Sequence, residues 1–480
     1  MSRGLSQKVQ SNPAEAFEIF YNIDKKAMAD LLLYKDQIED YGQKISSHLQ
    51  GGGRVFLGGC GATGRLSLLL ESLMRKYSQY KDQVISFMAG GDFALVRSIE
   101  GMEDHEELGA RHLMDVGFKP GDLFIGFTEG GETPYVIGAT LKAAELSPEK
   151  SFFIYCNPTD VLVNHIERSR RTINSKDVHA LSIANEPMAL SGSTRLQATT
   201  LLSFVGGYFL GLSGYSEFSE ALAAWQSDHS LTSYLKMITL TQLEADAYQK
   251  GEFFNYIAGD LSLTVLTDTT ERSPTFSLSS FENSRLSDHA HSWCYLFVRD
   301  AHSSEAAWET ILGRKPRPLF WDELLDKAGD VYLGFDLSED GLNARKKRVS
   351  KASHDFKVND LKGGFEFKCN DFHQEFIFRD PSPLNIHLQA KVLLNAHSTI
   401  LMGMCHRYES NVMTYVRPSN GKLIDRASRY LQALLAERGQ QVGLDECSKH
   451  LYATYQTIGD GPPLVIEALK SFPPLSEAKA

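Results

Sequence analysis

The chain has 480 residues, of which 42% are hydrophobic and 23% are charged, an ordinary composition for globular chains and enough for about three domains. Its net charge of −11 disfavours nonspecific binding to nucleic acid or to an anionic membrane, so neither is expected as a partner. The six cysteines are scattered without a C-x-x-C pair, which excludes an obvious disulfide framework or zinc knuckle.

The first 45 residues are predicted to form an N-terminal helical segment. The polar opening MSRGLSQKVQ lacks the apolar core of a secretory leader, so a cytoplasmic protein is expected. Between Pro13 and Leu49, apolar residues recur at helical spacing among charges, which predicts two helices. At Gly51 the pattern changes to GGGRVFLGG, which is typical of a buried parallel strand.

A first α/β domain is predicted over residues 46–250. The strand-like runs RVFLGG, VISFMAGG, DLFIGFT, SFFIYCNP and HALSIAN alternate with helices over Leu66 to Tyr77, His105 to Val116 and Pro134 to Glu145. This alternation predicts a doubly wound parallel sheet, whose ligands bind beyond the carboxyl ends of the strands. The uncharged run Ala198 to Ser216 is nearly long enough to span a bilayer, but its glycines and hydroxyl residues favour a buried core helix.

A second α/β domain is predicted over residues 251–415 and a C-terminal helical cap over 416–480. Its strand-like runs are LSLTVLTD from Leu261, SWCYLFVRD, VYLGFDLS, FEFKCN and EFIFRD, with a helix near Ala306 to Leu312. Helices are expected again over Leu388 to Met404 and Lys422 to Glu437. The basic run Arg345 to Arg348 is interpreted as a solvated helix face. The pattern therefore predicts an α/β fold class, with a doubly wound parallel sheet in the first domain and a second α/β unit with more irregular connections, and two tandem doubly wound parallel-sheet domains are what the family resemblance described below implies.

Two glycine-rich loops follow strands of the first domain, in GGCGATGRLS and FTEGGETPYV. Glycines let the backbone approach a ligand, and hydroxyls together with the free N–H groups of a helix start can bind phosphate. A tight capped turn without any ligand would use the same residue types. The candidate ligand-binding residues of these loops are Gly61, Thr63, Gly64, Arg65, Thr128, Gly130, Gly131 and Thr133.

A third loop, LSGSTRLQATT, places Ser191, Ser193, Thr194 and Arg195 just before the predicted buried helix. Hydroxyls and an arginine at a helix start make an anion-binding group of residues. Because all three loops follow strands of one sheet, they are expected to converge on one pocket for a phosphorylated ligand.

An acidic run, EGMEDHEEL, carries Glu103, which can hydrogen-bond sugar hydroxyls or act as a general base, or can simply complement a helix dipole. For Glu106 and Glu107 the dipole interpretation is preferred. His289 and His291 form an H-x-H pair without an acidic or cysteine neighbour, so no metal site is predicted. Nothing in the sequence indicates a cofactor.

Taken together, GCGATGRLS, MAGGDFALVRSIEGMEDHEELG, GETPYVIGATL, CNP and LSGSTRL resemble the sugar isomerase (SIS) domain family. More narrowly, they are similar to the branch of N-acetylmuramic acid 6-phosphate etherases and glucokinase regulatory proteins, over roughly residues 45 to 215. The blocks TDTTERSPTF, KVLLNAHSTILMG and PSNGKLIDRASRYL resemble the second domain and cap of the regulatory proteins. The resemblance implies two tandem SIS domains and a ligand-binding Lys422 that reaches in from the cap.

The departures from the family pattern bear on activity. Etherases of this family use two glutamates, and Glu103 matches one of them, while Leu73 stands at the other position. Glu71 is two residues away, a rotation of about 200° around a helix, and is a poor substitute. Gly130 replaces a serine of the family and Gln197 replaces a lysine, while Glu132 adds a carboxylate that would repel phosphate unless it faces away.

The resemblance and its departures predict a regulatory protein that senses a phosphorylated hexose, such as fructose 6-phosphate, and controls a partner. For the glucokinase regulatory proteins that partner is a hexokinase-type enzyme. The first alternative is an etherase-like lyase or a sugar-phosphate isomerase that uses Glu103. The second alternative is a degenerate SIS scaffold that makes protein contacts only.

Overall fold

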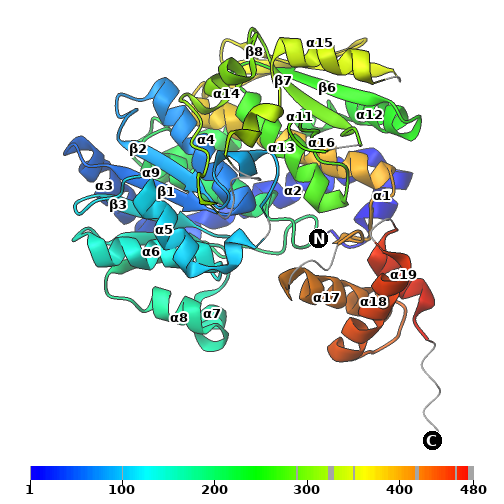
Figure 1. Ribbon diagram of the computed structural model, residues 1–480, viewed down its shortest axis with the longest axis horizontal. Helices are drawn as coiled ribbons and strands as arrows, with labels where there is room; N and C mark the ends of the chain where they lie inside the picture. Colours follow the sequence, from blue (N-terminus) through cyan, green and yellow to red (C-terminus); the bar gives the residue numbers. More distant parts are fainter. Residues whose placement is uncertain are drawn as a thin grey trace, which may run out of the picture.

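The structure is a computed structural model that describes residues 2–99, 101–287, 290–322, 329–349, 352–416, 421–459 and 462–473, without the side chains of residues 421 and 422. It contains two five-stranded sheets. Helices surround both sheets, and the C-terminal helices stand to one side of them (Figure 1).

The N-terminal segment forms α1 (Leu5–Ser11), α2 (Pro13–Asp30), a 3-10 turn (Leu31–Tyr34) and α3 (Lys35–Gln50). The two helices predicted between Pro13 and Leu49 are present as α2 and α3. Proline stands at the first position of α2, where no N–H is needed, and Phe17 and Phe20 are fully buried on one face.

The first sheet is parallel throughout, with the strand order β2-β1-β3-β4-β5. Its strands are β1 (Val55–Gly59), β2 (Val84–Met88), β3 (Leu123–Phe127), β4 (Ser151–Tyr155) and β5 (Val178–Ser182). The helices of this lobe are α4 (Gly61–Tyr77), α5 (Glu106–Asp115), α6 (Pro134–Leu146), α7 (Thr159–His165) and α8 (Glu167–Ile173). The predicted doubly wound sheet is confirmed. The strand order reverses between β1 and β3, which opens a crevice at their carboxyl ends.

Four helices connect the two sheets: α9 (Gln197–Phe209), α10 (Phe218–Asp228), α11 (Leu231–Leu235) and α12 (Ile238–Gln249). Every residue of α9 is buried, so the predicted core helix is confirmed. Within the described residues, no helix has both the length and the apolar character needed to cross a membrane.

The second sheet is mixed, with the order β10-β9-β8-β6-β7. Its strands are β6 (Phe253–Ala258), β7 (Cys294–Val298), β8 (Ser353–Leu361), β9 (Gly364–Cys369) and β10 (Phe372–Ile377). β6 is parallel to β7 and β8, whereas β9 and β10 add an antiparallel hairpin. The helices of this lobe are α13 (Ser262–Phe276), α14 (Ser304–Leu312) and α15 (Glu339–Arg348). The α/β class is therefore confirmed, and only the first sheet is purely parallel.

Three sequence interpretations in this lobe are wrong. LSLTVLTD belongs to helix α13, which is buried on nearly all sides, so its polar residues do not gather on one exposed face. VYLGFDLS contains a 3-10 turn (Asp330–Gly334) rather than a strand. Arg345 is not solvated, because it is buried and its Nε lies 2.9 Å from Glu282 Oε1.

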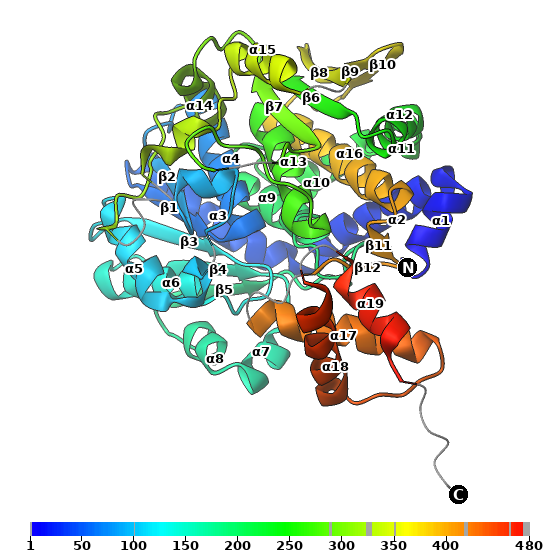
Figure 2. The same cartoon turned by 45° about the vertical axis from the view of Figure 1, so that its right-hand side comes forward.

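The remaining elements are α16 (Pro383–Met404), β11 (Tyr408–Glu409), β12 (Val412–Met413), α17 (Gly421–Glu437), α18 (Leu444–Ile458) and α19 (Leu464–Ser471). Helix α16 is buried and passes between the second sheet and the N-terminal helices (Figure 2). Helices α17, α18 and α19 pack on one another and are called the cap below. One apolar cluster extends from α1 through both lobes to α19.

Candidate ligand-binding site

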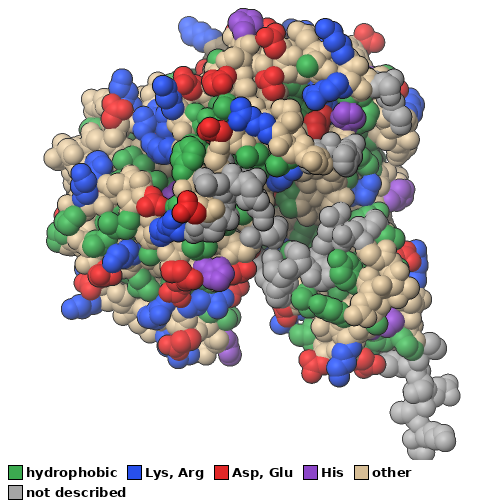
Figure 3. Space-filling view, viewed as in Figure 1, with side chains coloured by type: hydrophobic (Ala, Val, Ile, Leu, Met, Phe, Trp, Pro, Cys, Tyr) green, Lys and Arg blue, Asp and Glu red, His purple; other side chains and the backbone are tan. Residues whose placement is uncertain are grey.

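A cavity of about 710 Å³ lies at the carboxyl edge of the first sheet, within the usual size of ligand pockets, ~300–1,000 Å³. Its wall contains the loops after β1 and β3, the loop before α9, the end of α13 with the residues that follow it, and the start of the cap helix α17. The cavity therefore occupies the crevice where the strand order reverses, as expected for an open α/β sheet. Figure 3 shows the cap standing apart from the first lobe, with a notch between them.

The loop after β1 turns directly into α4, five residues earlier than the sequence predicts. Thr63 Oγ1 accepts a hydrogen bond from Cys60 N at 3.1 Å and donates one to Cys60 O at 2.9 Å, so its hydroxyl caps the helix. A Cβ on Gly64 would lie 2.5 Å from Met88 Cβ, so this glycine is required for packing. Of the glycines in this loop, Gly61, with φ +51° and open space beside it, lines the cavity.

The loop after β3 brings Thr128, Gly130 and Thr133 to the cavity wall. The hydroxyls of Thr128 and Thr133 lie 2.9 Å apart and share a hydrogen bond. Gly131 does not line the cavity: its carbonyl accepts a hydrogen bond from Ser169 Oγ at 2.7 Å, and its φ of +72° needs glycine.

Glu132 is on the cavity wall, but its carboxylate lies 3.5 Å from Arg168 Nη2. Arg168 Nε also donates to the main-chain oxygen of Glu132 at 2.5 Å. The sequence left open whether Glu132 faces away from the ligand. The structure instead pairs its charge with an arginine of the same wall, which reduces its repulsion of an anion.

The loop before α9 places Ser193 and Thr194 on the wall. Ser193 is 4% exposed, and its Oγ has no hydrogen-bond partner among the described residues. Such a buried hydroxyl is costly without a partner, so Ser193 is suited to bind a ligand. Ser191 is turned elsewhere: its N–H donates to Asn411 O at 2.8 Å, and its carbonyl accepts a hydrogen bond from the hydroxyl of Tyr430 in the cap.

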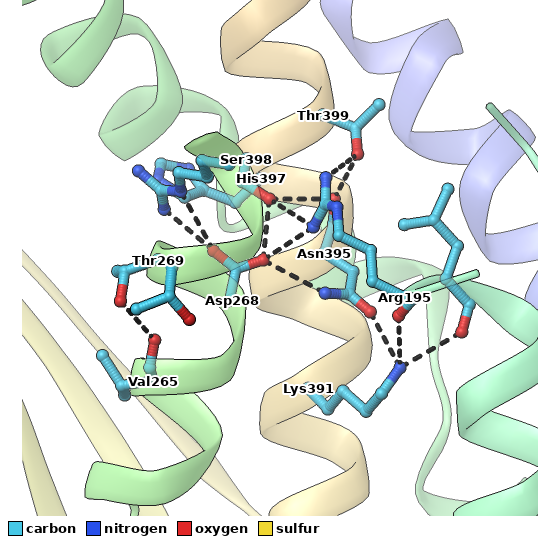
Figure 4. A network of polar contacts seen from close by, with 12 residues as sticks. Arg195, Val265, Asp268, Thr269, Lys391, Asn395, His397, Ser398 and Thr399 are labelled. Carbon is cyan, nitrogen blue, oxygen red and sulfur yellow. Dashed lines mark hydrogen bonds and ion pairs between the residues drawn. The ribbon is translucent and has the colours of Figure 1, made fainter. Parts of the chain in front are cut away.

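Two arginines that the sequence offers to an anion are already engaged in buried ion pairs. Arg65 pairs with Glu271, and its Nε donates to Leu95 O at 3.2 Å. Arg195 Nη1 lies 2.9 Å from Asp268 Oδ1, and its guanidinium also donates to Ser398 and Thr399 (Figure 4). Removing either partner of such a pair leaves a buried charge without a counter-charge. Both arginines therefore stabilise the structure of the cavity wall.

The cap contributes Arg426, which sequence reasoning missed. Arg426 lines the cavity, is half-buried, and has no hydrogen bond or ion pair to any residue that the structure describes. A Cβ on Gly192 would lie 3.1 Å from Arg426 Nε, so this guanidinium sits against the loop before α9. The side chain of Lys422, the predicted cap residue, lies outside the described part of the structure. The available signal was the spacing of four residues, which puts position 426 one turn further along the predicted helix.

Charges on the cavity wall are balanced. The arginines are Arg65, Arg97, Arg168, Arg195 and Arg426, and the acids are Glu103, Asp104, Glu129, Glu132 and Glu271. Glu103 lies in a 3-10 turn (Met102–Asp104) and is half-buried. An anionic ligand would therefore rely on local N–H groups, hydroxyls and Arg426 rather than on an overall basic field.

Glu71 and Leu73 do not line the cavity. Glu71 is 1% exposed and lies 3.0 Å from both Arg314 and Arg317, which belong to the segment after α14. Burial alone would raise the pKa of Glu71, but Arg314 and Arg317 outweigh it and lower the pKa to about 2. This carboxylate is a permanent ion-pair partner, which supports the expectation that it cannot replace the missing etherase glutamate.

In the second lobe, a carboxylate of the chain itself lies at the turn between β6 and α13. Asp360 Oδ2 accepts a hydrogen bond from Asp260 N at 3.1 Å, and a Cβ on Gly259 would lie 2.3 Å from the same oxygen. Lys76 and Tyr77 of α4 contact Asp260 from the first lobe. A carboxylate therefore occupies the start of α13, where an anion would otherwise bind.

The predicted absence of a metal at the H-x-H pair concerns His289, which lies outside the described residues. His291 Nδ1 lies 3.3 Å from Glu282, which also pairs with Arg345. Among the described side chains, Glu366, His373 and Glu375 on the β9–β10 hairpin are spaced closely enough to hold an ion, although Lys368 Nζ already lies 2.8 Å from Glu366.

Residues 37–144 match the family described as the glucokinase regulatory protein N-terminal SIS domain. The matched residues lie in α3 and the first lobe, which are therefore similar to an SIS domain. The matched residues include the first two cavity loops and Glu103. The loop before α9 and the cap lie beyond them.

Relatives of the SIS domain include N-acetylmuramic acid 6-phosphate etherases. The etherase of Synechococcus elongatus is 32% identical over 197 residues, 41% of this chain and 60% of the etherase. That of Bacillus subtilis is 30% identical over 200 residues, 41% of this chain and 62% of the etherase. The alignments thus span about 60% of the length of these relatives.

Among solved structures, tagatose-6-phosphate ketose/aldose isomerase from Escherichia coli aligns with a TM-score of 0.45 and 16% identity, covering 84% of this chain and 97% of the isomerase.

Proposed function

We propose that this chain is a regulatory protein that binds a phosphorylated hexose, such as fructose 6-phosphate, in the cavity between the SIS domain and the cap. The observation that carries this proposal is the presence, on one cavity wall, of the Ser193 hydroxyl and the Arg426 guanidinium, neither of which has a hydrogen-bond or ion-pair partner among the described residues. One donor belongs to the first lobe and the other to the cap, so one anion can bridge the two.

The remaining wall suits a sugar phosphate. The start of α4, residues 61 to 63, lines the cavity, where the positive end of a helix dipole favours an anion, and Gly61 leaves room for it. Glu103 offers a carboxylate to sugar hydroxyls. The wall has no excess of positive charge. Backbone donors and hydroxyls can bind phosphate without one.

Regulation follows from the same geometry. A ligand that contacts both lobe and cap stabilises the arrangement in which both contacts are made, in proportion to its differential affinity for that arrangement. A partner that binds one arrangement of the cap would then respond to the sugar phosphate. Similarity to a glucokinase regulatory protein domain supports a hexokinase-type enzyme as that partner.

The test is a thermal-shift and calorimetry panel with fructose 6-phosphate, fructose 1-phosphate, glucosamine 6-phosphate, N-acetylglucosamine 6-phosphate and N-acetylmuramic acid 6-phosphate, with free fructose as control. A ligand at 100 times its dissociation constant should add about 2.7 kcal/mol of stability. Arg426→Gln should weaken binding about tenfold or more, because a charge-assisted contact is lost. If no phosphorylated hexose binds, the proposal is wrong.

A second candidate is an etherase-like lyase or a sugar-phosphate isomerase. It is favoured by the similarity to the etherases and by the position of Glu103 on the cavity wall. Mass spectrometry of the N-acetylmuramic acid 6-phosphate mixture would detect released lactate. If turnover is found, Glu103→Gln should abolish it while sugar-phosphate binding persists.

A further inference from the structure

A buried lysine of the second lobe lies directly beneath the loop that carries Ser193. Lys391 belongs to α16 and is 7% exposed. Its Nζ lies within hydrogen-bond distance of Arg195 O (2.9 Å), Leu196 O (3.1 Å), Thr200 Oγ1 (2.8 Å) and Asn395 Oδ1 (2.9 Å) (Figure 4). An ammonium has three N–H donors, so all its capacity is used in this site.

Two of these acceptors are main-chain oxygens at the exit of the loop. Leu196 is the N-cap residue of α9, and the carbonyl of Arg195 precedes it. A side chain that is hydrogen-bonded to both carbonyls fixes the direction in which the loop enters helix α9. Ser193 lies two residues before Arg195. Its N–H donates a hydrogen bond to Leu190 O, and its carbonyl accepts one from Leu196 N, so the loop forms a tight turn.

Charged groups of several elements surround the Lys391 side chain. Asp24 of α2 and Asp268 of α13 are the acids that act on Lys391 most strongly, while Arg195 opposes them. Burial lowers the pKa of Lys391, and the carboxylates partly restore it. Asp24 is tied to the same region, because it accepts a hydrogen bond from Gln197 Nε2 at 2.7 Å.

The side chain of Arg195 is also anchored from the second lobe. It pairs with Asp268 of α13 and donates to Ser398 and Thr399 of α16. The loop is therefore held on its buried side by the second lobe, while Gly192, Ser193 and Thr194 face the cavity.

We propose that Lys391 is a positioning residue for the ligand: by fixing the carbonyls of Arg195 and Leu196 it presets Ser193 and Thr194 toward the cavity. This inference rests on the proposed function. Through Lys391, the second lobe sets the affinity of a site whose ligand contacts belong to the first lobe and the cap.

The test compares Lys391→Met with His387→Leu. Methionine keeps the unbranched shape and most of the length of the lysine side chain and removes its donors. His387 lies one turn earlier on α16, is equally buried, and bonds Thr264 rather than the loop. The variant at His387 therefore controls for loss of a buried polar contact in the same helix. Both are measured at a temperature where circular dichroism shows them folded.

Hydrogen exchange of peptides covering residues 189–197 should be about tenfold faster in Lys391→Met than in wild type, and fructose 6-phosphate should bind about tenfold more weakly. His387→Leu should change neither. Unchanged exchange and affinity in Lys391→Met, or equal changes in both variants, would overturn the inference. If Lys391→Met does not fold, Thr200→Val removes one acceptor without removing the charge, and it should still accelerate exchange of this segment. Unaltered exchange would then refute the inference.

If wild-type protein binds none of the sugar phosphates, the proposed function fails, and the exchange measurement still decides whether Lys391 positions the loop.

Discussion

Ser193 and Thr63 are both hydroxyl residues of the cavity wall, but their hydroxyls have different roles. That of Ser193 lacks a partner among the described residues, whereas that of Thr63 closes the N-terminal cap of α4. Ser193→Ala should therefore weaken sugar-phosphate binding about tenfold and leave the free energy of unfolding nearly unchanged. Thr63→Ala should cost about 1 kcal/mol of stability through the lost cap. Calorimetry and urea titration of both variants check this, and a large stability loss in Ser193→Ala would contradict it.

Glu71 gives a prediction for pH. Its folded-state pKa of about 2 lies below the unfolded value, so the stabilisation is complete above about pH 5 and is lost as the pH falls through 2. The shift corresponds to about 3 kcal/mol. Glu71→Gln should be strongly destabilised at pH 7, because Arg314 and Arg317 lose their partner, and its stability should fall less steeply between pH 5 and 2. Denaturant titrations at several pH values test this. Parallel pH curves for the two proteins would refute it.

At the scale of elements, the junction between the loop before α9 and the cap depends on Gly192. Its φ is +73°, and a Cβ there would lie 2.5 Å from the Tyr430 hydroxyl. Gly192→Ala should displace α17, speed protease cleavage of the cap and weaken ligand binding. Gly211 is the matched control, because it has a φ of +75° but no atom within 4 Å of the added Cβ. Gly211→Ala carries the same backbone strain and should leave both properties intact. Equal effects of the two substitutions would show that strain alone is responsible.

Sequence patterns predicted the elements of the first lobe well because its parallel strands are short apolar runs bounded by glycines, and its helices carry charged faces. The sequence patterns failed where tertiary packing, rather than local residue spacing, decides the structure. Helix α13 is enclosed by protein, so its β-branched residues look like a strand. β8, with the sequence SHDFKVNDL, is polar because one of its faces is exposed in part. Two glycine-rich loops and one hydroxyl-rich loop pointed to the cavity, but local spacing could not reveal that Thr63 caps a helix or that Arg195 pairs with Asp268, 73 residues away.

The two lobes share one interior. Arg195 of the first lobe finds its acid, Asp268, in the second, and Asp24 of the N-terminal helices accepts hydrogen bonds from Gln197 and Tyr234. A fragment of residues 1–250 would leave Arg195 buried without a partner, or open to water in a damaged core. We therefore expect this fragment not to fold alone, and the two lobes of the intact chain to unfold in one calorimetric transition. Two transitions separated in temperature, or a folded fragment by circular dichroism, would show independent lobes.

The position of Asp360 bears on how many ligand molecules the chain can bind. The strand ends of the first sheet border an open cavity, whereas the turn before α13 in the second lobe already holds a carboxylate of its own chain. A chain with two α/β lobes but one open site binds ligand with a stoichiometry of one. Its saturation curve is then hyperbolic, and occupancy rises from a tenth to nine tenths over roughly an eighty-fold range of ligand concentration. If the proposed function holds, the protein would grade its response to the sugar phosphate rather than switch at a threshold.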